Sequence, residues 1–212
     1  MNTMQKCLTL VDFQNDFVAP EGALTFDNGA GDPALIKRMN VFFDNLPKGY
    51  FDHGIMTYDT HDPKNYFDTE EAISFPLHCA TNTRGWHLAI NPLKVFNKIP
   101  NSQILKKTTY DMWAGTIDNV NPVFLQVPQD VTIIGVASDI CNKAAMEGWL
   151  ERGAKVTIID DLTRGIFKET KEVVADDKYA QYRKAGKLRV INSLQFFREI
   201  NNVNPRSQGG RP

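Results

Sequence analysis

The chain has 212 residues, and its 24 Lys and Arg nearly balance its 25 Asp and Glu. This length suits one large α/β domain, and the missing basic excess argues against nucleic acid as the main partner. No apolar run approaches the roughly 18 residues that span a bilayer, and the first residues do not resemble a secretory signal. We therefore expect a cytoplasmic protein without a membrane partner.

The first half of the chain alternates strand and helix signals. The short apolar run 7–11 predicts a strand buried on both faces. Asp32 and Pro33 are typical of a helix start, and 54–58 indicates a second strand. The stretch 63–101 is rich in Pro, Asn, Thr and Gly, which predicts a loop-rich excursion over one face.

The second half continues the alternation and ends in a polar segment. We expect one domain over residues 1–200, followed by a mobile tail over 201–212. The alternation predicts a three-layer α-β-α sandwich with a mainly parallel, doubly wound sheet of about six strands. The remaining predicted elements are strands over 104–107, 131–136, 155–159 and 188–191, and helices over 139–152 and 167–185.

Reactive side chains follow several of the predicted strands. Asp12 follows the first strand, Asp59 and His61 follow the second, Lys107 ends the third, and Cys141 comes just after 131–136. The carboxyl ends of parallel strands share one edge of the sheet, where ligands bind. We expect these side chains to meet there.

Cys141 stands at the start of a predicted helix, whereas Cys7 and Cys79 belong to no C-x-x-C pair or disulfide framework. Free N–H groups in a first helical turn stabilise a thiolate and could hold an oxyanion. The alternative is a buried structural cysteine, the common fate of a free thiol. Position alone leaves both interpretations open.

Lys107 and Asp12 favour the catalytic interpretation of Cys141. A lysine near the sulfur would lower the thiol pKa, and an aspartate could carry the thiol proton to a leaving amine. The alternatives are a solvated lysine, like its neighbour Lys106, and a turn residue after a strand.

Asp59, His61 and His78 form a candidate metal group. One carboxylate and two imidazoles suit a divalent transition metal with positions left open for water or substrate. Loop histidines are more often surface or hydrogen-bonding residues, which is how we interpret His53 and His87.

Three segments resemble motifs of the isochorismatase-like cysteine hydrolases. They are DFQNDF at 12–17, KTTY at 107–110 and GVASDIC at 135–141, where Ser138 stands in place of a threonine. The resemblance runs in order from about residue 6 to residue 165. Three ordered motifs are far more specific than any one of them.

The resemblance implies the roles of the site residues. It assigns Asp12, Lys107 and Cys141 as the catalytic triad of a hydrolase that cleaves a linear carbon–nitrogen bond. It also implies a cis peptide between Val136 and Ala137, which would point the N–H of Ala137 at the same oxyanion as the N–H of Cys141.

Two further segments are similar to the metal-containing nicotinamidase branch of this family. They are DTH at 59–61 and FPLHCATNTRG at 75–85, whose Phe75 stands where tryptophan is usual. This likeness implies Asp59, His61 and His78 as ligands of one divalent ion, with zinc favoured over iron or manganese. It also implies nicotinamide, or a similar aromatic carboxamide, as the substrate.

Aromatic side chains could form the walls of a pocket for such a flat ring. Phe17, Phe75 and Trp113 are the candidates, and core packing is an equal alternative for each. Another amide, carbamoyl or ureido substrate, or a non-catalytic binding relative, also stays open, as does a homo-oligomer. The nucleotide-binding glycine motifs are absent, which argues against a nucleotide-binding α/β protein. The resemblance implies a small amide as the partner.

Overall fold

The computed structural model of the chain describes residues 5–114 and 127–203. Its six strands form one parallel sheet in the order β3-β2-β1-β4-β5-β6, which confirms the predicted sheet. The strands are β1 (Lys6–Val11), β2 (His53–Asp59), β3 (Ser102–Lys107), β4 (Asp130–Val136), β5 (Lys155–Arg164) and β6 (Leu188–Ile191).

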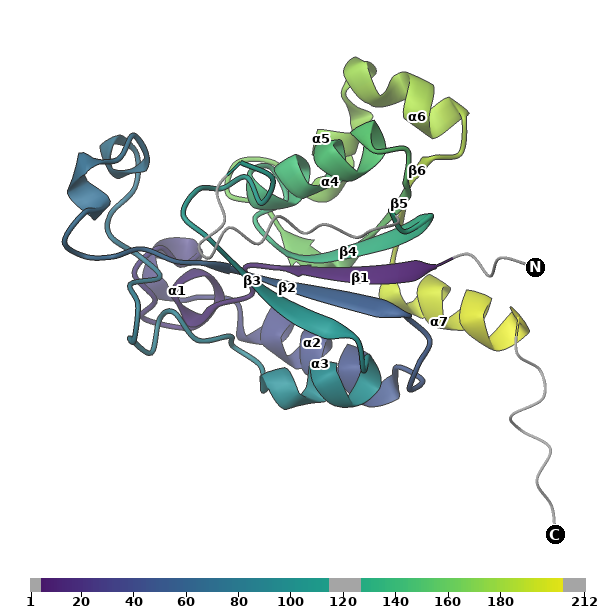
Figure 1. Cartoon of the computed structure of the whole chain (residues 1–212), viewed down its shortest axis with the longest axis horizontal. Coiled ribbons are helices and arrows are strands. Elements are labelled where there is room, and N and C mark those ends of the chain that lie inside the picture. Colours follow the sequence, from purple (N-terminus) through teal and green to yellow (C-terminus); the bar gives the residue numbers. More distant parts are fainter. Residues whose placement is uncertain (1–4, 115–126, 204–212) are drawn as a thin grey trace, which may run out of the picture.

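Helices cover both faces of the sheet, which completes the predicted three-layer sandwich. Figure 1 shows α2, α3 and α7 on one face and α4, α5 and α6 on the other. The α-helices are α1 (Asn15–Val18), α2 (Pro33–Asn45), α3 (Pro92–Lys98), α4 (Cys141–Glu151), α5 (Thr170–Ala175), α6 (Ala180–Lys184) and α7 (Ser193–Val203). Short 3₁₀ helices are η1 (Asp27–Gly29), η2 (Tyr66–Asp68), η3 (Glu71–Ile73) and η5 (Asp177–Tyr179).

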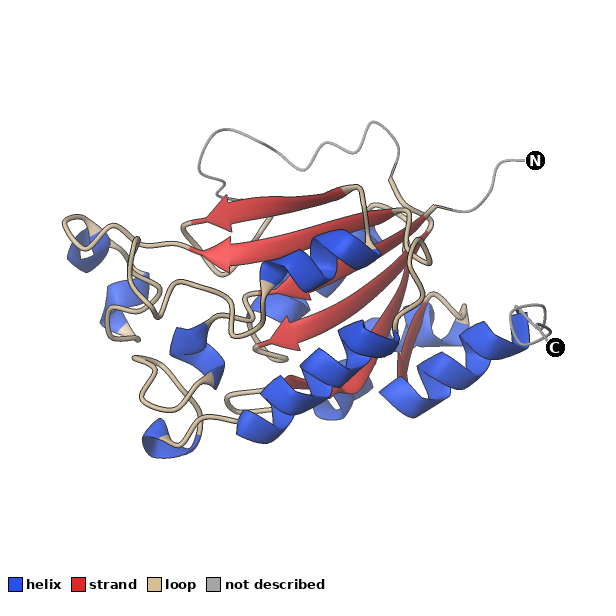
Figure 2. Ribbon diagram, turned by 90° about the horizontal axis from the view of Figure 1, so that it is seen from below, coloured by secondary structure: helices blue, strands red, loops and turns tan. Residues whose placement is uncertain are grey.

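The chain reverses its direction of winding between β1 and β4. From β1 the sheet grows outward to β2 and β3, and from β4 it grows the other way to β5 and β6. The strand arrows of Figure 2 point toward the side where the short helices and loops gather. A crevice at the carboxyl ends of the strands, next to this switch point, is where such sheets bind ligands.

Local signals explain the strand and helix that lead into the site. β1 is buried along five of its six residues, as a continuous apolar run predicts. The carboxylate of Asp32 accepts the N–H of Leu35 at 2.8 Å, and Pro33 occupies the first turn of α2. In the last turn of α2, Phe42 packs against Phe196 and Phe197 of α7, a helix that the sequence interpretation missed.

Two predicted helices differ from the observed ones. The single helix predicted over 167–185 is wrong: it is broken into α5, η5 and α6. Asp176 has an extended conformation (φ −51°, ψ 136°), and its carboxylate accepts the N–H of Lys178. The helix expected from Asp139 begins at Cys141, because the Asp139 side chain turns away to bind the backbone of 166–168.

The excursion over 63–101 contains η2, η3 and α3 between loops. Residues 201–203, placed in the tail by the sequence interpretation, are the last residues of α7, and the rest of that tail lies outside the described residues. None of the helices in the described ranges is long and apolar enough to cross a bilayer.

Candidate active site

The structure brings Asp12, Lys107 and Cys141 together at the carboxyl edge of the sheet. Asp12 follows β1, Lys107 is the last residue of β3, and Cys141 is the first residue of α4. All three side chains are buried. Three segments far apart in sequence therefore bring a carboxyl group, an amino group and a thiol to one point.

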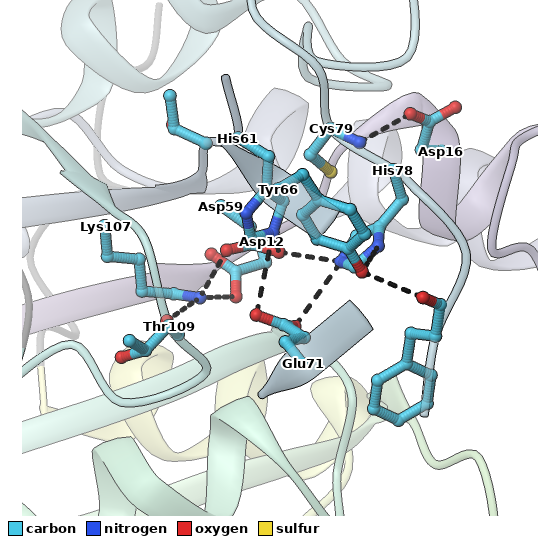
Figure 3. Close-up of polar contacts among 12 residues, drawn as sticks. Asp12, Asp16, Asp59, His61, Tyr66, Glu71, His78, Cys79, Lys107 and Thr109 are labelled. Carbon is cyan, nitrogen blue, oxygen red and sulfur yellow. Dashed lines mark hydrogen bonds and ion pairs between the residues drawn. The ribbon is translucent and has the colours of Figure 1, made fainter. Parts of the chain in front are cut away.

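Lys107 contacts both other members of this group, and Figure 3 shows it beside Asp12, Asp59 and Thr109. Its Nζ is 2.7 Å from Asp12 Oδ2, 3.4 Å from Asp59 Oδ1 and 3.8 Å from Cys141 Sγ, and it donates to the carbonyl of Thr109 at 2.9 Å. Burial works against its charge, but the two aspartates raise the pKa of Lys107 well above its usual value. Lys107 is a buried cation, and the solvated-lysine alternative is wrong.

Asp12 is held in a backbone conformation that few side chains adopt, with φ at 42°. Its N–H donates to Thr57 Oγ1 at 3.0 Å, and the Thr57 hydroxyl donates back to Asp12 Oδ1 at 2.6 Å. Burial raises the pKa of Asp12, and Lys107 offsets this only in part. A carboxylate of raised pKa that points at Lys107 is suited to accept and return a proton.

The thiol of Cys141 is buried among charged side chains. Burial is the main reason that its pKa lies well above the usual value, and the charges of Asp12 and Asp59 add to the shift. Lys107 opposes the shift, as expected, but does not outweigh it. The lowering effect predicted for Lys107 is therefore present but is outweighed by burial, which makes the neighbouring carboxylate of Asp12 the candidate base for the thiol proton.

Two backbone N–H groups lie beside this thiol. The peptide between Val136 and Ala137 is cis, as the family resemblance implies. Neither the N–H of Ala137 nor that of Cys141 donates to another group within the described residues, and both residues line the same pocket. Such free donors are the groups that an oxyanion needs.

The predicted metal group comes together next to the strand ends, with one further member. Asp59 Oδ2 lies 3.1 Å from His61 Nε2 and 3.0 Å from His78 Nε2. Glu71 adds a second carboxylate, 3.7 Å from the His61 nitrogen and 3.6 Å from the His78 nitrogen (Figure 3). The four potential ligand atoms lie within 4.8 Å of one another.

This set fits a divalent transition metal, because two imidazole nitrogens and two carboxylate oxygens are ligands that zinc, iron and manganese accept. Burial opposes the charge of Asp59, but Lys107 and the two imidazoles lower its pKa. His78 Nδ1 lies 2.8 Å from the Pro76 carbonyl, so a proton on Nδ1 leaves Nε2 free to bind a metal.

Asp16 and Gln14 support the metal group from outside it. The carboxylate of Asp16 accepts the N–H of Cys79, next to His78, at 2.7 Å. The amide of Gln14 binds both the N–H and the carbonyl of Asp59, at 2.8 Å each. Asp16 is thus a structural residue of α1, and Gln14 ties the end of β2 to the start of α1.

A pocket opens above the thiol and the metal group. Phe17 and Phe75 belong to its walls, as predicted. The walls that the sequence interpretation missed are mostly apolar and come from four separate loops; they are Leu24, Phe26, Tyr110, Ile140 and Ile166. A small flat molecule entering here would meet Cys141 on one side and the metal group on the other.

Trp113 does not line this pocket, so its predicted role as a wall is wrong. Its ring packs edge-on against Trp149 of α4, with centroids 4.8 Å apart, and the guanidinium of Arg152 lies 3.7 Å from its centroid. Gly148 is required beneath it, because a Cβ there would lie 1.9 Å from the indole nitrogen. Trp113 therefore packs on the outside of α4.

Comparison with known proteins agrees with this architecture. An isochorismatase family protein of Bacillus subtilis is 31% identical over 144 residues, which cover 65% of this chain and 74% of the relative. The nicotinamidase of Saccharomyces cerevisiae is 27% identical over 222 residues, covering 88% of this chain and 99% of the relative. No family model matches the chain.

Solved structures share the fold. A nicotinamidase/pyrazinamidase of Bacillus subtilis superimposes with a TM-score of 0.67 at 23% identity, over 89% of this chain and 100% of that one. A pyrazinamidase of Pyrococcus horikoshii in complex with zinc gives 0.65 at 23%, over 89% and 99%. The fold and site define a parallel α/β protein with a buried cysteine centre. The chain belongs to the isochorismatase family.

Proposed function

We propose that this chain hydrolyses nicotinamide, or a similar aromatic carboxamide, to the acid and ammonia through a thioester on Cys141. The observation that carries the proposal is the contact of Lys107 with Asp12 and Cys141, directly beside a four-residue metal group in one pocket. The yeast relative, matched over nearly its whole length, is a nicotinamidase.

In the proposed first half-reaction, Asp12 takes the thiol proton while Lys107 stabilises the thiolate. The sulfur attacks the carboxamide carbon, and the N–H groups of Ala137 and Cys141 hold the oxyanion. The carbon–nitrogen bond then breaks, and Asp12 returns the proton so that ammonia leaves. The acyl group stays on Cys141 as a thioester.

In the second half-reaction, water attacks the thioester. Asp12 accepts a proton from this water, and the tetrahedral intermediate uses the same two N–H groups. The carbon–sulfur bond breaks, the thiol regains its proton from Asp12, and the acid is released. Asp12 thus handles one proton in each direction, which suits a carboxyl group whose pKa is raised by burial.

Asp59, His61, Glu71 and His78 would hold one divalent ion, and zinc is the best candidate for this donor set. When bound, the ion would supply a Lewis acid for the ring nitrogen of the substrate. Phe17 and Phe75 would orient the ring. Lys107 would be linked to the ion through Asp59, whose carboxylate it contacts. The zinc complex of the Pyrococcus horikoshii pyrazinamidase supports this assignment.

The test is ammonia release across a panel of amides, carbamoyl and ureido compounds, with and without chelator, together with elemental analysis. We expect ammonia from nicotinamide and its loss in Cys141→Ala, by at least about 10³-fold. Cys7→Ala, which removes a buried thiol from the start of β1, is the control and keeps its activity.

Ammonia release that survives in Cys141→Ala would overturn the mechanism. Preference for a carbamoyl or ureido compound would reassign the substrate and leave the chemistry in place. A thiol probe that fails to label Cys141 selectively would point to a binding protein. A fully active, metal-free preparation would remove the metal group from the site.

A further inference from the structure

Asn142 is a polar residue in a fully buried position, directly after Cys141 in the first turn of α4. Its side-chain Nδ2 donates to the carbonyl of Gly135 at 2.9 Å. Its Oδ1 is buried and has no hydrogen-bond partner within the described residues. Burial of an amide with one unpaired oxygen is unfavourable for folding. The hydrogen bond to Gly135 therefore points to a role for Asn142 other than stability.

The strand that Asn142 contacts is irregular at that point. The pairing of β4 with β5 shifts register between Ile133 and Gly135. Gly135 has φ at 110°, and a Cβ on it would lie 2.0 Å from the Val11 carbonyl oxygen. Regular hydrogen bonds between β4 and β5 therefore do not by themselves determine the backbone conformation between β4 and Cys141.

Asn142 binds this backbone on both sides of the Val136–Ala137 peptide. Its side chain holds the Gly135 carbonyl, which precedes this peptide, and its own N–H donates to the Ala137 carbonyl, which follows it, at 3.0 Å. The N–H of Ile140 reaches the same Ala137 carbonyl at 3.1 Å. The peptide that carries the N–H of Ala137 is thus anchored at both ends to the start of α4.

We propose that Asn142 is a positioning residue that sets the direction of the Ala137 N–H relative to Cys141. The inference rests on the proposed function, because it gives the Ala137 N–H the task of holding the oxyanion. Asn142 would act on the oxyanion through Ala137, whose carbonyl accepts its N–H. Its effect should therefore appear where negative charge develops on the substrate oxygen.

The consequence is a separation between two kinds of reaction at the same sulfur. Amide hydrolysis passes through an oxyanion, whereas alkylation of Cys141 by iodoacetamide displaces iodide from carbon and forms no oxyanion. Loss of one oxyanion donor lowers kcat by about 10²–10³-fold. Loss of the Asn142 amide would displace the Ala137 N–H but not remove it. We therefore expect kcat to fall by about 10–100-fold, while KM and the alkylation rate stay unchanged.

The test compares Asn142→Leu, which keeps the size but removes the donor, with Asn40→Leu. Asn40 is the matched control: its amide also donates to a backbone carbonyl, that of Ile36 at 3.0 Å, but on α2 across the sheet. Asn142→Ala serves as the second variant in case the leucine side chain disturbs packing. For each variant, kcat, KM and the rate of iodoacetamide alkylation are measured.

A further readout does not need turnover. Pyridine-3-carboxaldehyde should form a thiohemiacetal: Sγ bonds to the aldehyde carbon, the carbonyl electron pair moves to oxygen, and Asp12 takes the thiol proton. Its dissociation constant is obtained from the protection of Cys141 against alkylation. We expect this constant to rise by about 10–100-fold in Asn142→Leu and to stay unchanged in Asn40→Leu.

The outcomes are distinguishable. Wild-type kcat and aldehyde affinity in Asn142→Leu and Asn142→Ala would overturn the role of Asn142, as would equal losses of turnover and alkylation. A wild-type protein that forms the aldehyde adduct but releases no ammonia from nicotinamide would contradict the proposed substrate, and the aldehyde constants would still decide on Asn142. A wild-type protein that forms no adduct would overturn both.

Discussion

Two groups of side chains meet at the carboxyl edge of the sheet, beside the pocket that Cys141 lines, and they are held in different ways. The strand-end group, Asp12, Lys107 and Cys141, lies where secondary structure elements of the sandwich end or begin, and all three residues are buried. The excursion group, Glu71, Phe75 and His78, comes from loops and 3₁₀ turns between β2 and α3, and Glu71 and Phe75 are only partly buried.

The excursion group depends on hydrogen bonds between loops for its placement. His61 and Ala80 form an isolated bridge, and the N–H of Cys79 reaches Asp16 of α1. The sheet thus fixes the residues that would make and break bonds, while the excursion adds Glu71 and His78 to the proposed metal ligand Asp59 at the end of β2 and adds Phe75 to the pocket wall. Function on loops over a rigid scaffold is a common division, and each group can be disturbed separately.

The largest expected effect comes from the strand-end group. Lys107→Met leaves Asp12 and Asp59 buried together without their cation, which we expect to cost about 3–5 kcal/mol of stability. Activity should fall by at least about 10²-fold. Urea unfolding and ammonia release measure the two effects.

The control is its neighbour Lys106→Met. The Nζ of Lys106 lies 5.5 Å from the ring centroid of Trp86. This cation–π contact is weak and contributes about 0.5–1 kcal/mol. Equal effects of the two substitutions would contradict the central place given to Lys107.

An intermediate effect is expected from the excursion group. His78→Ala removes one ligand and should abolish metal retention in elemental analysis while KM rises, because the ring loses its anchor. The iodoacetamide reaction of Cys141 should continue, since the thiol and Lys107 are untouched. His87→Ala is the control, because His87 lies in the same excursion but packs at a tilt against Trp86. Loss of alkylation together with the metal would show that the two groups act as one.

The smallest effect is expected from an ion pair outside both groups, which gives a baseline. Burial opposes the charge of Glu147 on α4, but Lys178 and Tyr179 lower its pKa. Its pairing therefore stabilises the fold fully at a pH above the pKa of Glu147 in the unfolded state, about 4.3. The stabilisation is lost as the pH falls through the lower pKa of Glu147 in the folded state. Glu147→Gln should cost less than about 1 kcal/mol at pH 7, and this difference should shrink in thermal melts at acid pH. A difference that grows toward acid pH would contradict the assignment.

The sequence by itself determined the layers, the strands and the strand-end group. Each of these depends on short-range patterns: apolar runs define buried strands, and a parallel sheet sends every strand end to one edge, so Asp12, Lys107 and Cys141 could be placed together before any contact was known. The likeness of 59–61 and 75–85 to known motifs added His78 in the same way.

Tertiary structure alone decided the remaining features. Glu71 joins the metal group because η3 brings its carboxylate close to His61 and His78, and no periodic pattern in the sequence predicts that contact. Trp113 leaves the pocket because Gly148 opens a place for its ring on α4. The raised pKa of the Cys141 thiol depends on burial, and the hydrogen bond from the Asn142 side chain depends on where that side chain points in the fold. Such quantities belong to the packed chain, because desolvation and hydrogen-bond geometry are set by neighbours that are distant in sequence.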